Sequence, residues 1–262
     1  MKSHGVIFLA ILFPLSSPAD VANRTPAAPS ERSPQPNGAA VEAEKQYHLG
    51  IQFAEGDGVP QDYARAAQFY RLAAEKGLAA AQYDLGYLYE LGKGVPRDLK
   101  QAAIWYRKAA SQGDAEAQNN LGVLFASGQG VARNDVEAIH WYRLAAAQDD
   151  PEATSNLGSM YLQGRAVKRD FAQAFNLFRK AAERGYAVAQ NNLALMYANG
   201  QAVARDYVWA YAWLDLAAAQ IQASAQLRDK VAKEMTADQI ARARDLASRK
   251  RSELNQKGDP SK

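Results

Sequence analysis

Residues that could act as nucleophiles, general acids or metal ligands are scarce in this 262-residue chain. It contains no cysteine, and its three histidines are His4, His48 and His140. No HExxH pattern places two histidines on one helix face, so the sequence predicts no zinc site. The serine signatures S-x-x-K and G-x-S-x-G are also missing. We therefore expect a protein with no catalytic residues, no metal and no cofactor.

Three glycine pairs resemble the start of a phosphate-binding loop: Gly56-Asp-Gly58, Gly92-Lys-Gly94 and Gly128-Gln-Gly130. The third glycine of a dinucleotide fingerprint is absent, and each loop joins two expected helices instead of a strand and a helix. A role in ending a helix is therefore favoured. Acidic residues are numerous, but no pair of them stands out as an acid/base couple.

The elements that would position any site come from a repeat of 36 residues. The dipeptide Leu-Gly recurs at 49–50, 85–86, 121–122 and 157–158, and becomes Leu-Ala at 193–194. An Asp or Asn recurs as a candidate helix cap at Asp62, Asp98, Asn134, Asp170 and Asp206. Apolar residues within each copy follow two helical stripes, and neither helix can bury its stripe alone. The pattern predicts an all-α solenoid of five helix-turn-helix repeats, 43–78, 79–114, 115–150, 151–186 and 187–222.

Recurrent glycines have two predicted roles. Gly50, Gly86, Gly122 and Gly158 lie inside the first helices, where a missing side chain lets two helices approach closely, and paired alanines are the expected partners. The glycines at 56, 92, 128, 164 and 200 are expected to end those helices in the left-handed conformation. In the last two copies, alanine (Ala166 and Ala202) replaces the second glycine of the loop, so we do not expect a positive φ at this position.

The repeated sequence pattern resembles the Sel1-like repeat, a relative of the tetratricopeptide repeat. The pattern is A-x-A-Q-x-x-L-G-x-x-Y-x-x-G-x-G-V-x-x-D-x-x-x-A-x-x-W-Y-x-x-A-A-x-x-G. The resemblance implies a right-handed α-solenoid whose first helices line a concave face, and a protein as the partner. Asp149-Asp150, Ala194 and Leu214 depart from the pattern. They predict a less regular junction between the third and fourth copies and an atypical last copy.

The chain ends have their own composition. Residues 1–19 have the pattern of a secretory signal with cleavage after Ala19, which favours a periplasmic protein, with secretion as the alternative. Residues 20–41 are rich in Pro, Ala and Ser and predict a disordered linker. Residues 223–252 predict two capping helices, the second opened by a capping box of Thr236 and Gln239, and residues 253–262 a flexible tail.

Positions that vary from copy to copy within the first helices form one stripe, which is the candidate partner-binding site on the concave face. The candidate residues are Tyr47, His48, Tyr83, Asp84, Tyr87, Asn119, Asn120, Val123, Asn156, Ser159 and Asn192. Tyrosines offer a large rigid contact area, and asparagine can hold an extended peptide backbone. The alternative is that the asparagines join adjacent repeats. Trp209 lies in an otherwise polar column, so it is either a binding anchor or, as favoured, covered by the C-terminal helices.

Charge adds a weaker signal. From Gln226 onward there are ten basic and six acidic residues, although the whole chain has a net charge of only +3. This basic end could contact an anionic envelope surface or an acidic partner, but a solvated helix face is favoured. Nothing indicates nucleic acid as a partner.

Taken together, these patterns favour a non-catalytic periplasmic scaffold, adaptor or regulator that binds an envelope or signalling protein, such as a sensor kinase's outer domain or an envelope-assembly factor. The alternatives are a secreted effector or adhesin that binds a host protein, and a cell-wall enzyme or glycan-targeting module.

Overall fold

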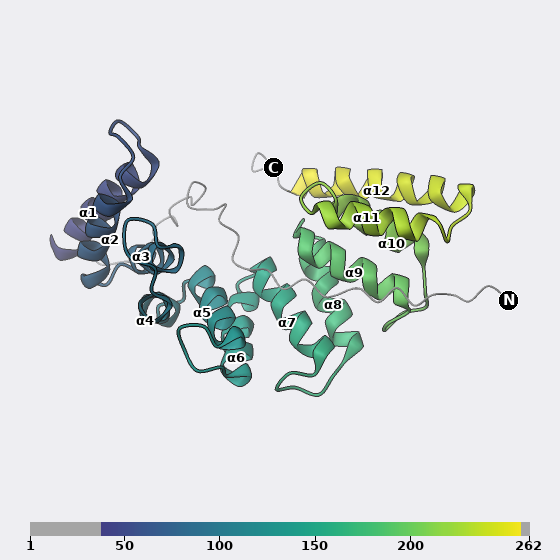
Figure 1. Ribbon diagram of the computed structural model, residues 1–262, viewed down its shortest axis with the longest axis horizontal. Helices are drawn as coiled ribbons and strands as arrows, with labels where there is room; N and C mark the ends of the chain where they lie inside the picture. The colour runs from purple at the N-terminus through teal and green to yellow at the C-terminus, as the bar shows by residue number, and fades with distance from the viewer. Residues whose placement is uncertain (1–37, 258–262) are drawn as a thin grey trace. The chain divides into compact units, whose positions relative to one another are not determined.

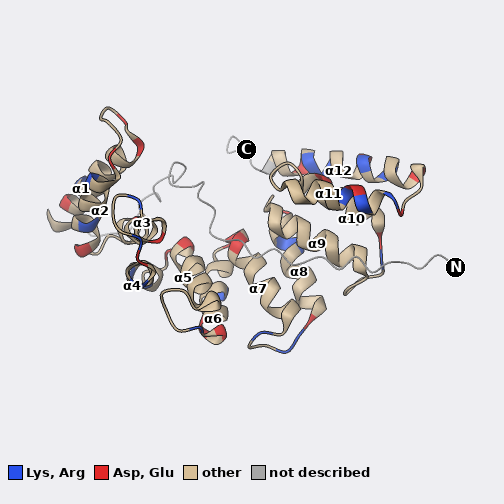
Figure 2. Cartoon of the chain, in the orientation of Figure 1, with Lys and Arg blue, Asp and Glu red and all other residues tan. Residues whose placement is uncertain are grey.

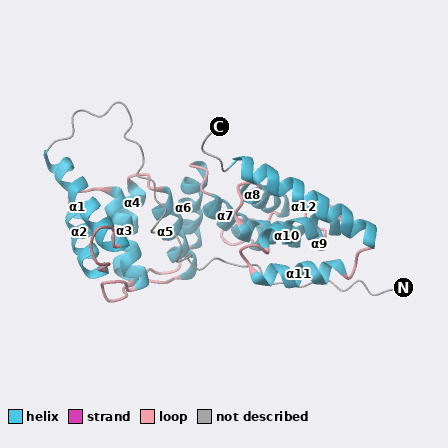
Figure 3. Ribbon diagram, turned by 90° about the horizontal axis from the view of Figure 1, so that it is seen from above, coloured by secondary structure: helices cyan, strands magenta, loops and turns pink. Residues whose placement is uncertain are grey.

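The computed structural model describes residues 38–257, whose regular structure is entirely helical (Figures 1 and 3). These residues fall into two compact units, 38–148 and 149–257. The first unit contains α1 (Gly38–Glu55), α2 (Tyr63–Glu75), α3 (Ala79–Leu91), α4 (Leu99–Ser111), α5 (Ala115–Ser127) and α6 (Asp135–Ala147). The second contains α7 (Pro151–Gln163), α8 (Phe171–Ala182), α9 (Ala187–Asn199), α10 (Tyr207–Ala217), α11 (Gln222–Ala232) and α12 (Ala237–Lys257). The predicted all-α solenoid class, with two helices in each copy, is confirmed.

Both ends of the described chain are more helical than the sequence predicts. Helix α1 begins at Gly38, so residues 38–41 are helical where the end of the linker was expected. The alanines and glutamates after Pro36, the last proline of that region, are good helix formers. Helix α12 continues to Lys257, into the predicted flexible tail. The predicted signal peptide and the rest of the linker lie outside the described residues.

Each second helix of a repeat begins at the Asp or Asn that the sequence predicts as its cap. The Asp62 carboxylate accepts hydrogen bonds from the backbone N–H groups of Ala64 and Arg65. The same column caps the later second helices through Asp98, Asn134, Asp170 and Asp206. These bonds satisfy first-turn donors that have no partner within the helix.

The loop between the two helices has a left-handed residue at both glycine columns. The first column behaves as expected, for example with φ 71° at Gly92 and 74° at Gly128. The expectation for the second column is wrong, because Ala166 and Ala202 take φ 52° and 68°, close to the 68° of Gly94. A backbone hydrogen bond from the cap residue to the aromatic of the first helix closes every copy of the loop, as in Asp206 N–H to the Tyr197 carbonyl. This closure imposes the conformation whichever residue is present, and alanine accepts the strain.

The helical glycines are contacted by aromatic rings, and the expected pairing with alanines is wrong. A Cβ on Gly86 would lie 2.9 Å from Cδ1 of Tyr106, and one on Gly122 would lie 2.7 Å from Cε1 of Tyr142. The same ring-on-glycine contact joins Gly50 to Tyr70 and Gly158 to Phe178. Each ring lies in the second helix of the copy whose first helix carries the glycine. A helix accepts the glycine because any side chain there would displace a buried ring.

The last repeat changes both members of this contact. The column of Gly50, Gly86, Gly122 and Gly158 continues as Ala194, and the ring column continues as Leu214. Both side chains are fully buried. Leucine is narrower than a phenyl ring, so the smaller side chain makes room for the added methyl group. The two departures noted in the sequence are therefore one compensated change of packing.

Glutamines of the A-x-A-Q motif join consecutive helices. The Gln82 side-chain amide donates to the Ala74 carbonyl at the end of α2, and its oxygen accepts a hydrogen bond from Gln112 at the end of α4. Gln118 makes the same two contacts with the Ala110 carbonyl and Gln148. In the fourth copy Thr154 takes this column, and its hydroxyl donates to the Asp150 carbonyl within its own helix.

Asp149, which departs from the repeat, keeps the backbone conformation of the glycine that it replaces. Its φ is 68°, whereas Gly77, Gly113 and Gly185 of the same column have φ between 86° and 97°. Its carboxylate lies 2.8 Å from both Lys180 Nζ and Arg184 Nη2. These cations lower the pKa of Asp149, so the contacts favour the folded chain at neutral pH and weaken as acid protonates the carboxylate.

The C-terminal helices cap the second unit. The predicted capping box is confirmed, because Thr236 N–H donates to Gln239 Oε1 and Gln239 N–H donates to Thr236 Oγ1. Helix α11 packs on α10 in the way that the first helix of a sixth repeat would. Helix α12 also packs on α10, and does not form a sixth hairpin with α11. Figure 3 shows α10 between the two capping helices.

The ring-on-glycine contact can be tested by copying the last repeat into the fourth. We expect Gly158→Ala to destabilise the chain by about 1 kcal/mol, because its Cβ would lie 3.0 Å from Phe178 Cε1 and the overpacking outweighs the gain in helix propensity. Phe178→Leu alone should cost roughly 1–2 kcal/mol through the cavity that it leaves. The double variant should lose less than the sum, with a coupling of at least about 0.5 kcal/mol in urea unfolding. Additive losses would contradict the assigned contact.

Candidate partner-binding surface

The first part of the predicted stripe is a buried tyrosine–aspartate contact. Tyr47 and Asp84 are each 5% exposed, and the Tyr47 hydroxyl donates to Asp84 Oδ2 over 2.9 Å. The Tyr47 ring also lies 5.7 Å from the ring of Tyr70, the residue that packs on Gly50. Tyr47 and Asp84 thus join α1, α2 and α3 and are covered by protein.

The next copy repeats the same arrangement. The half-buried Tyr83 ring lies 5.6 Å from Tyr106, at an interplanar angle close to that of Tyr47 and Tyr70. Tyr83 also stacks on Tyr87, which is 4% exposed. The Tyr106 hydroxyl donates to Glu90 Oε2 over 2.6 Å, and it also contacts the Asn120 side chain. Burial, and then the Glu90 charge, raise the pKa of Tyr106, so the phenol stays neutral and can donate.

The asparagine part of the stripe is also interior. Asn119, Asn120, Asn156, Ser159 and Asn192 are buried, whereas Val123 is partly exposed and His48 is exposed. Asn119 donates to Asn120, and Asn191 accepts a hydrogen bond from Ser224 of α11. The Asn191–Ser224 contact joins two helices and fits the alternative in which the asparagines hold helices together, whereas the Asn119–Asn120 contact lies within α5.

Asn192 differs from its column because both amide atoms are buried with no hydrogen-bond partner. In the second copy, the Tyr106 hydroxyl of the second helix reaches Asn120 of the following first helix. The residue in register with Tyr106 is Phe178, which has no hydroxyl. Asn192 therefore lacks a partner because Phe178, 14 residues earlier in the chain, has no hydroxyl group.

An exposed surface that the sequence did not single out lies on the second helices. We define the outer ridge of each second helix as the three positions in register with Ala64, Gln68 and Leu72 of α2. The corresponding residues are Lys100, Ile104 and Lys108 in α4, Val136, His140 and Leu144 in α6, Ala172, Asn176 and Lys180 in α8, and Val208, Ala212 and Leu216 in α10. Every member is exposed in α2, α4, α6 and α8, but Ala212 and Leu216 of α10 are buried.

Large apolar side chains on these ridges are concentrated in residues 38–148. Leu72, Ile104, Val136 and Leu144 are 46%, 48%, 67% and 39% exposed. No large apolar side chain is comparably exposed among the described residues of the second unit. Contiguous exposed apolar surface marks candidate interaction sites, and Val136 and Leu144 lie eight residues apart on the same face of α6. Comparison of the outer columns along the sequence could have revealed them.

A charged column runs beside the outer ridges. It holds Arg71, Arg107, Arg143 and Arg179, and then reverses sign at Asp215. The Arg71 and Arg107 guanidinium groups lie 5.9 and 5.2 Å from the ring centres of Tyr89 and Phe125 in the following first helices. These cation–π contacts link successive copies.

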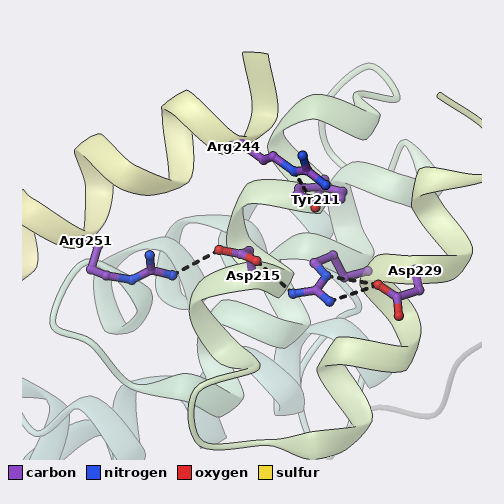
Figure 4. Close-up of polar contacts among 6 residues, drawn as sticks. Tyr211, Asp215, Asp229, Arg244 and Arg251 are labelled. Atoms are coloured by element: carbon purple, nitrogen blue, oxygen red, sulfur yellow. Dashed lines mark hydrogen bonds and ion pairs between the residues drawn. The ribbon is translucent and has the colours of Figure 1, made fainter. Parts of the chain in front are cut away.

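Reversal of charge at Asp215 creates the contact that holds the cap (Figure 4). Asp215 Oδ1 accepts a hydrogen bond from Arg228 of α11 over 2.9 Å, and Oδ2 accepts one from Arg251 of α12 over 3.0 Å. Arg244 of α12 donates to the Tyr211 hydroxyl over 3.4 Å. One carboxylate on α10 thus joins both capping helices.

The basic C-terminal residues are interspersed with acidic partners (Figure 2). Arg242 pairs with Asp238, Arg249 with Asp245, and Lys250 with Glu253. The α12 surface is therefore a mixture of both charges, which agrees with the solvated face favoured from the sequence.

Trp209 belongs to the core of the second unit. Its half-buried ring lies 5.7 Å from Tyr197 and 6.4 Å from Trp213. It packs against the cluster that includes Leu227 of α11 and Ala243 of α12. Its ring neighbours lie on α9 and α10, so covering by the C-terminal helices stays a prediction.

Within residues 38–257 no group of His, Asp and Glu side chains is arranged to hold a metal ion. None of the helices in this range is both long and apolar enough to cross a membrane. A cavity of about 130 Å³, lined by Glu183, Trp213, Lys250, Glu253 and Leu254, has room for a few water molecules.

The five copies match the model of the Sel1 repeat at residues 44–78, 79–114, 115–150, 151–186 and 187–220. The chain belongs to the Sel1 repeat family. Sel1 repeats are generally protein-interaction modules and generally non-catalytic scaffolds. The observed ring-on-glycine contacts, capped second helices and left-handed loop glycines explain which residues of the Sel1 repeat recur here.

Two solved Sel1-type structures are similar to this chain. A Sel1 repeat protein from Oxalobacter formigenes is 36% identical, with a TM-score of 0.67 over 71% of this chain and 74% of that one. The protein c5321, a protective antigen of uropathogenic Escherichia coli strains, is 32% identical with a TM-score of 0.54. That match covers 84% of this chain but only 57% of c5321, so this chain spans little more than half of that relative. No curated protein matched the sequence.

The unpartnered Asn192 amide gives a prediction for stability. Phe178→Tyr should place a hydroxyl beside Asn192 and stabilise the Sel1 array by up to about 1 kcal/mol, seen as a higher thermal midpoint. The gain should vanish in an Asn192→Leu background, where no amide remains to receive the bond. A gain of equal size in both backgrounds would contradict the proposed pairing.

The cap gives a second prediction. We expect Asp215→Asn to destabilise the chain by about 1–2 kcal/mol, because one half-buried carboxylate makes charged hydrogen bonds with two arginines. Asp245→Asn is the matched control, because Asp245 and Arg249 are 67% and 66% exposed and their pair should contribute at most about 0.5 kcal/mol. Thermal unfolding and protection of α12 from hydrogen exchange would measure both effects. Equal losses in the two variants would contradict the role of Asp215.

Proposed function

We propose that this Sel1 repeat protein is an exported, non-catalytic scaffold that binds an envelope or signalling protein. The proposal of export rests on the sequence of residues 1–19, which has the charged, apolar and small-residue pattern of a secretory signal. The partner class follows from the family, whose repeats generally bind proteins. An outer domain of a sensor kinase or an envelope-assembly factor fits this role.

The observation that carries the proposal is the apolar outer surface of residues 38–148. The side chains of Leu72, Ile104, Val136 and Leu144 are 39–67% exposed, although other copies carry polar residues in the same three columns, namely Lys108, Gln68 and Lys100. The exposed part of an apolar side chain contributes no burial free energy to folding, but burying it under a partner is favourable. Of the predicted stripe, His48, Tyr83 and Val123 retain exposed surface, and we propose them as secondary contacts.

Partner capture tests this function directly. The full chain, tagged at its C-terminus and expressed in its own cells, should fractionate with the periplasm and cross-link to a specific envelope protein. A variant with Leu72, Ile104, Val136 and Leu144 changed to serine should recover at least ten-fold less of that protein. These side chains are exposed, so circular dichroism should show an unchanged fold.

The matched control carries serine at Ala172, Asn176 and Lys180, the outer ridge of α8, and should recover the partner as well as the wild type does. Retention of the tagged protein in the cytoplasm, or capture of no specific protein, would contradict the proposal. Hydrolysis of purified peptidoglycan by the mature protein would instead support the cell-wall enzyme alternative.

A further inference from the structure

The cavity of the second unit is formed where three helices meet. Glu183 at the end of α8, Trp213 of α10, and Lys250, Glu253 and Leu254 of the last turns of α12 line it. Its volume of about 130 Å³ is close to that of an engineered apolar cavity of about 150 Å³ that holds benzene. A compact ligand of about six non-hydrogen atoms therefore fits the space.

The Glu183 carboxylate brings an unbalanced negative charge to this cavity. Within residues 38–257, its side chain makes no ion pair and no hydrogen bond. The neighbouring cations Lys180 and Arg184 both pair with Asp149 instead. Glu183 is also the C-cap of α8, where the helix dipole disfavours a negative charge. The fold thus holds a partly buried carboxylate that contributes nothing evident to stability.

The rest of the cavity wall is neutral or apolar. Lys250 Nζ lies 2.7 Å from Glu253 Oε2, so these two charges offset each other and the three ionised lining groups sum to −1. Trp213 is 2% exposed, and Leu254 packs against the core cluster that contains Trp213. An aromatic ring attracts a cation as well as an apolar chain. The lining therefore favours a ligand that is both positively charged and apolar.

We propose that this cavity binds a small primary ammonium compound with a short apolar chain. Its ammonium group faces Glu183 and the negative end of the α8 dipole, and its chain packs on the Trp213 ring and Leu254. The ligand site is separate from the protein-binding surface proposed above and does not depend on it. Because the ligand contacts α8, α10 and α12 together, its binding also holds the C-terminal cap against the array.

The Trp213 indole gives a local signal for binding. The chain has four tryptophans, and with ¹⁵N-labelled tryptophan the Trp213 indole resonance is identified by its loss in Trp213→Phe. Its N–H is buried with no hydrogen-bond partner, so no bond within the protein fixes its chemical shift. Titration of the full chain with n-butylammonium should move this resonance saturably. The uncharged isostere 1-butanol should bind at least ten-fold more weakly, because it leaves Glu183 unbalanced.

Two variants separate charge recognition from simple filling of a cavity. Glu183→Gln should weaken n-butylammonium at least ten-fold and leave circular dichroism and the thermal midpoint unchanged, because no bond within the protein is lost. Glu75→Gln is the matched control, since the exposed Glu75 is in register with Glu183 three copies earlier. It should bind as the wild type does. Leu254→Phe should abolish binding by filling the cavity while every charge remains.

Hydrogen exchange tests the link to the cap. Saturating n-butylammonium should slow exchange of the α12 amides in the wild type and have no such effect in Glu183→Gln. Equal binding of n-butylammonium and 1-butanol would overturn the inference, and so would equal affinities of Glu183→Gln and Glu75→Gln. Absence of any saturable shift of the Trp213 resonance would show that the cavity holds water only, and would overturn it as well.

Discussion

Each of the first four copies depends on an aromatic ring packed against a helix at a residue without a side chain. The contact of Tyr106 with Gly86 brings two backbones closer than any Cβ would allow, and so fixes where the second helix crosses the first. The same contact fixes the position of the Tyr106 hydroxyl, which lies at the far edge of the ring. In the second copy that hydroxyl reaches Glu90 and Asn120, so a steric constraint inside one helix pair positions a polar contact with the next pair.

The same geometry separates two kinds of variation among the copies. The first helices are nearly surrounded by protein, so a change there is matched by a change in a neighbour, as with Ala194 and Leu214, or it leaves a cost, as with Asn192. The second helices keep one side in water, where one column alternates between leucine and lysine, as at Leu72 and Lys108, with no matching change in a buried neighbour. Variation is therefore evidence of recognition only on the second kind of surface.

The local Thr-x-x-Gln pattern predicted the capping box at Thr236, and periodicity was enough to predict the helices of the repeats, their caps and the left-handed loop glycines. It could not show that Tyr47 and Asp84 are buried, because a repeat pattern tells which residues vary and does not tell which side of a helix its neighbours cover. The positive φ of Ala202 was missed because a backbone hydrogen bond, and not the residue type, determines it. The sequence could have predicted the ring partner of Gly86, because the glycine column and the ring column change together at Ala194 and Leu214.

Asp215 also bears on how long such an array can be. Both capping helices form ion pairs with the last second helix through one column whose other members are all arginine. A gain or loss of whole copies upstream would leave those contacts intact. The number of copies can therefore change during evolution while the C-terminal cap is kept. By contrast, an acidic residue arising in the same column of α8 would offer α12 a rival attachment one copy too early, and the stranded final copy would become an easy target for proteases.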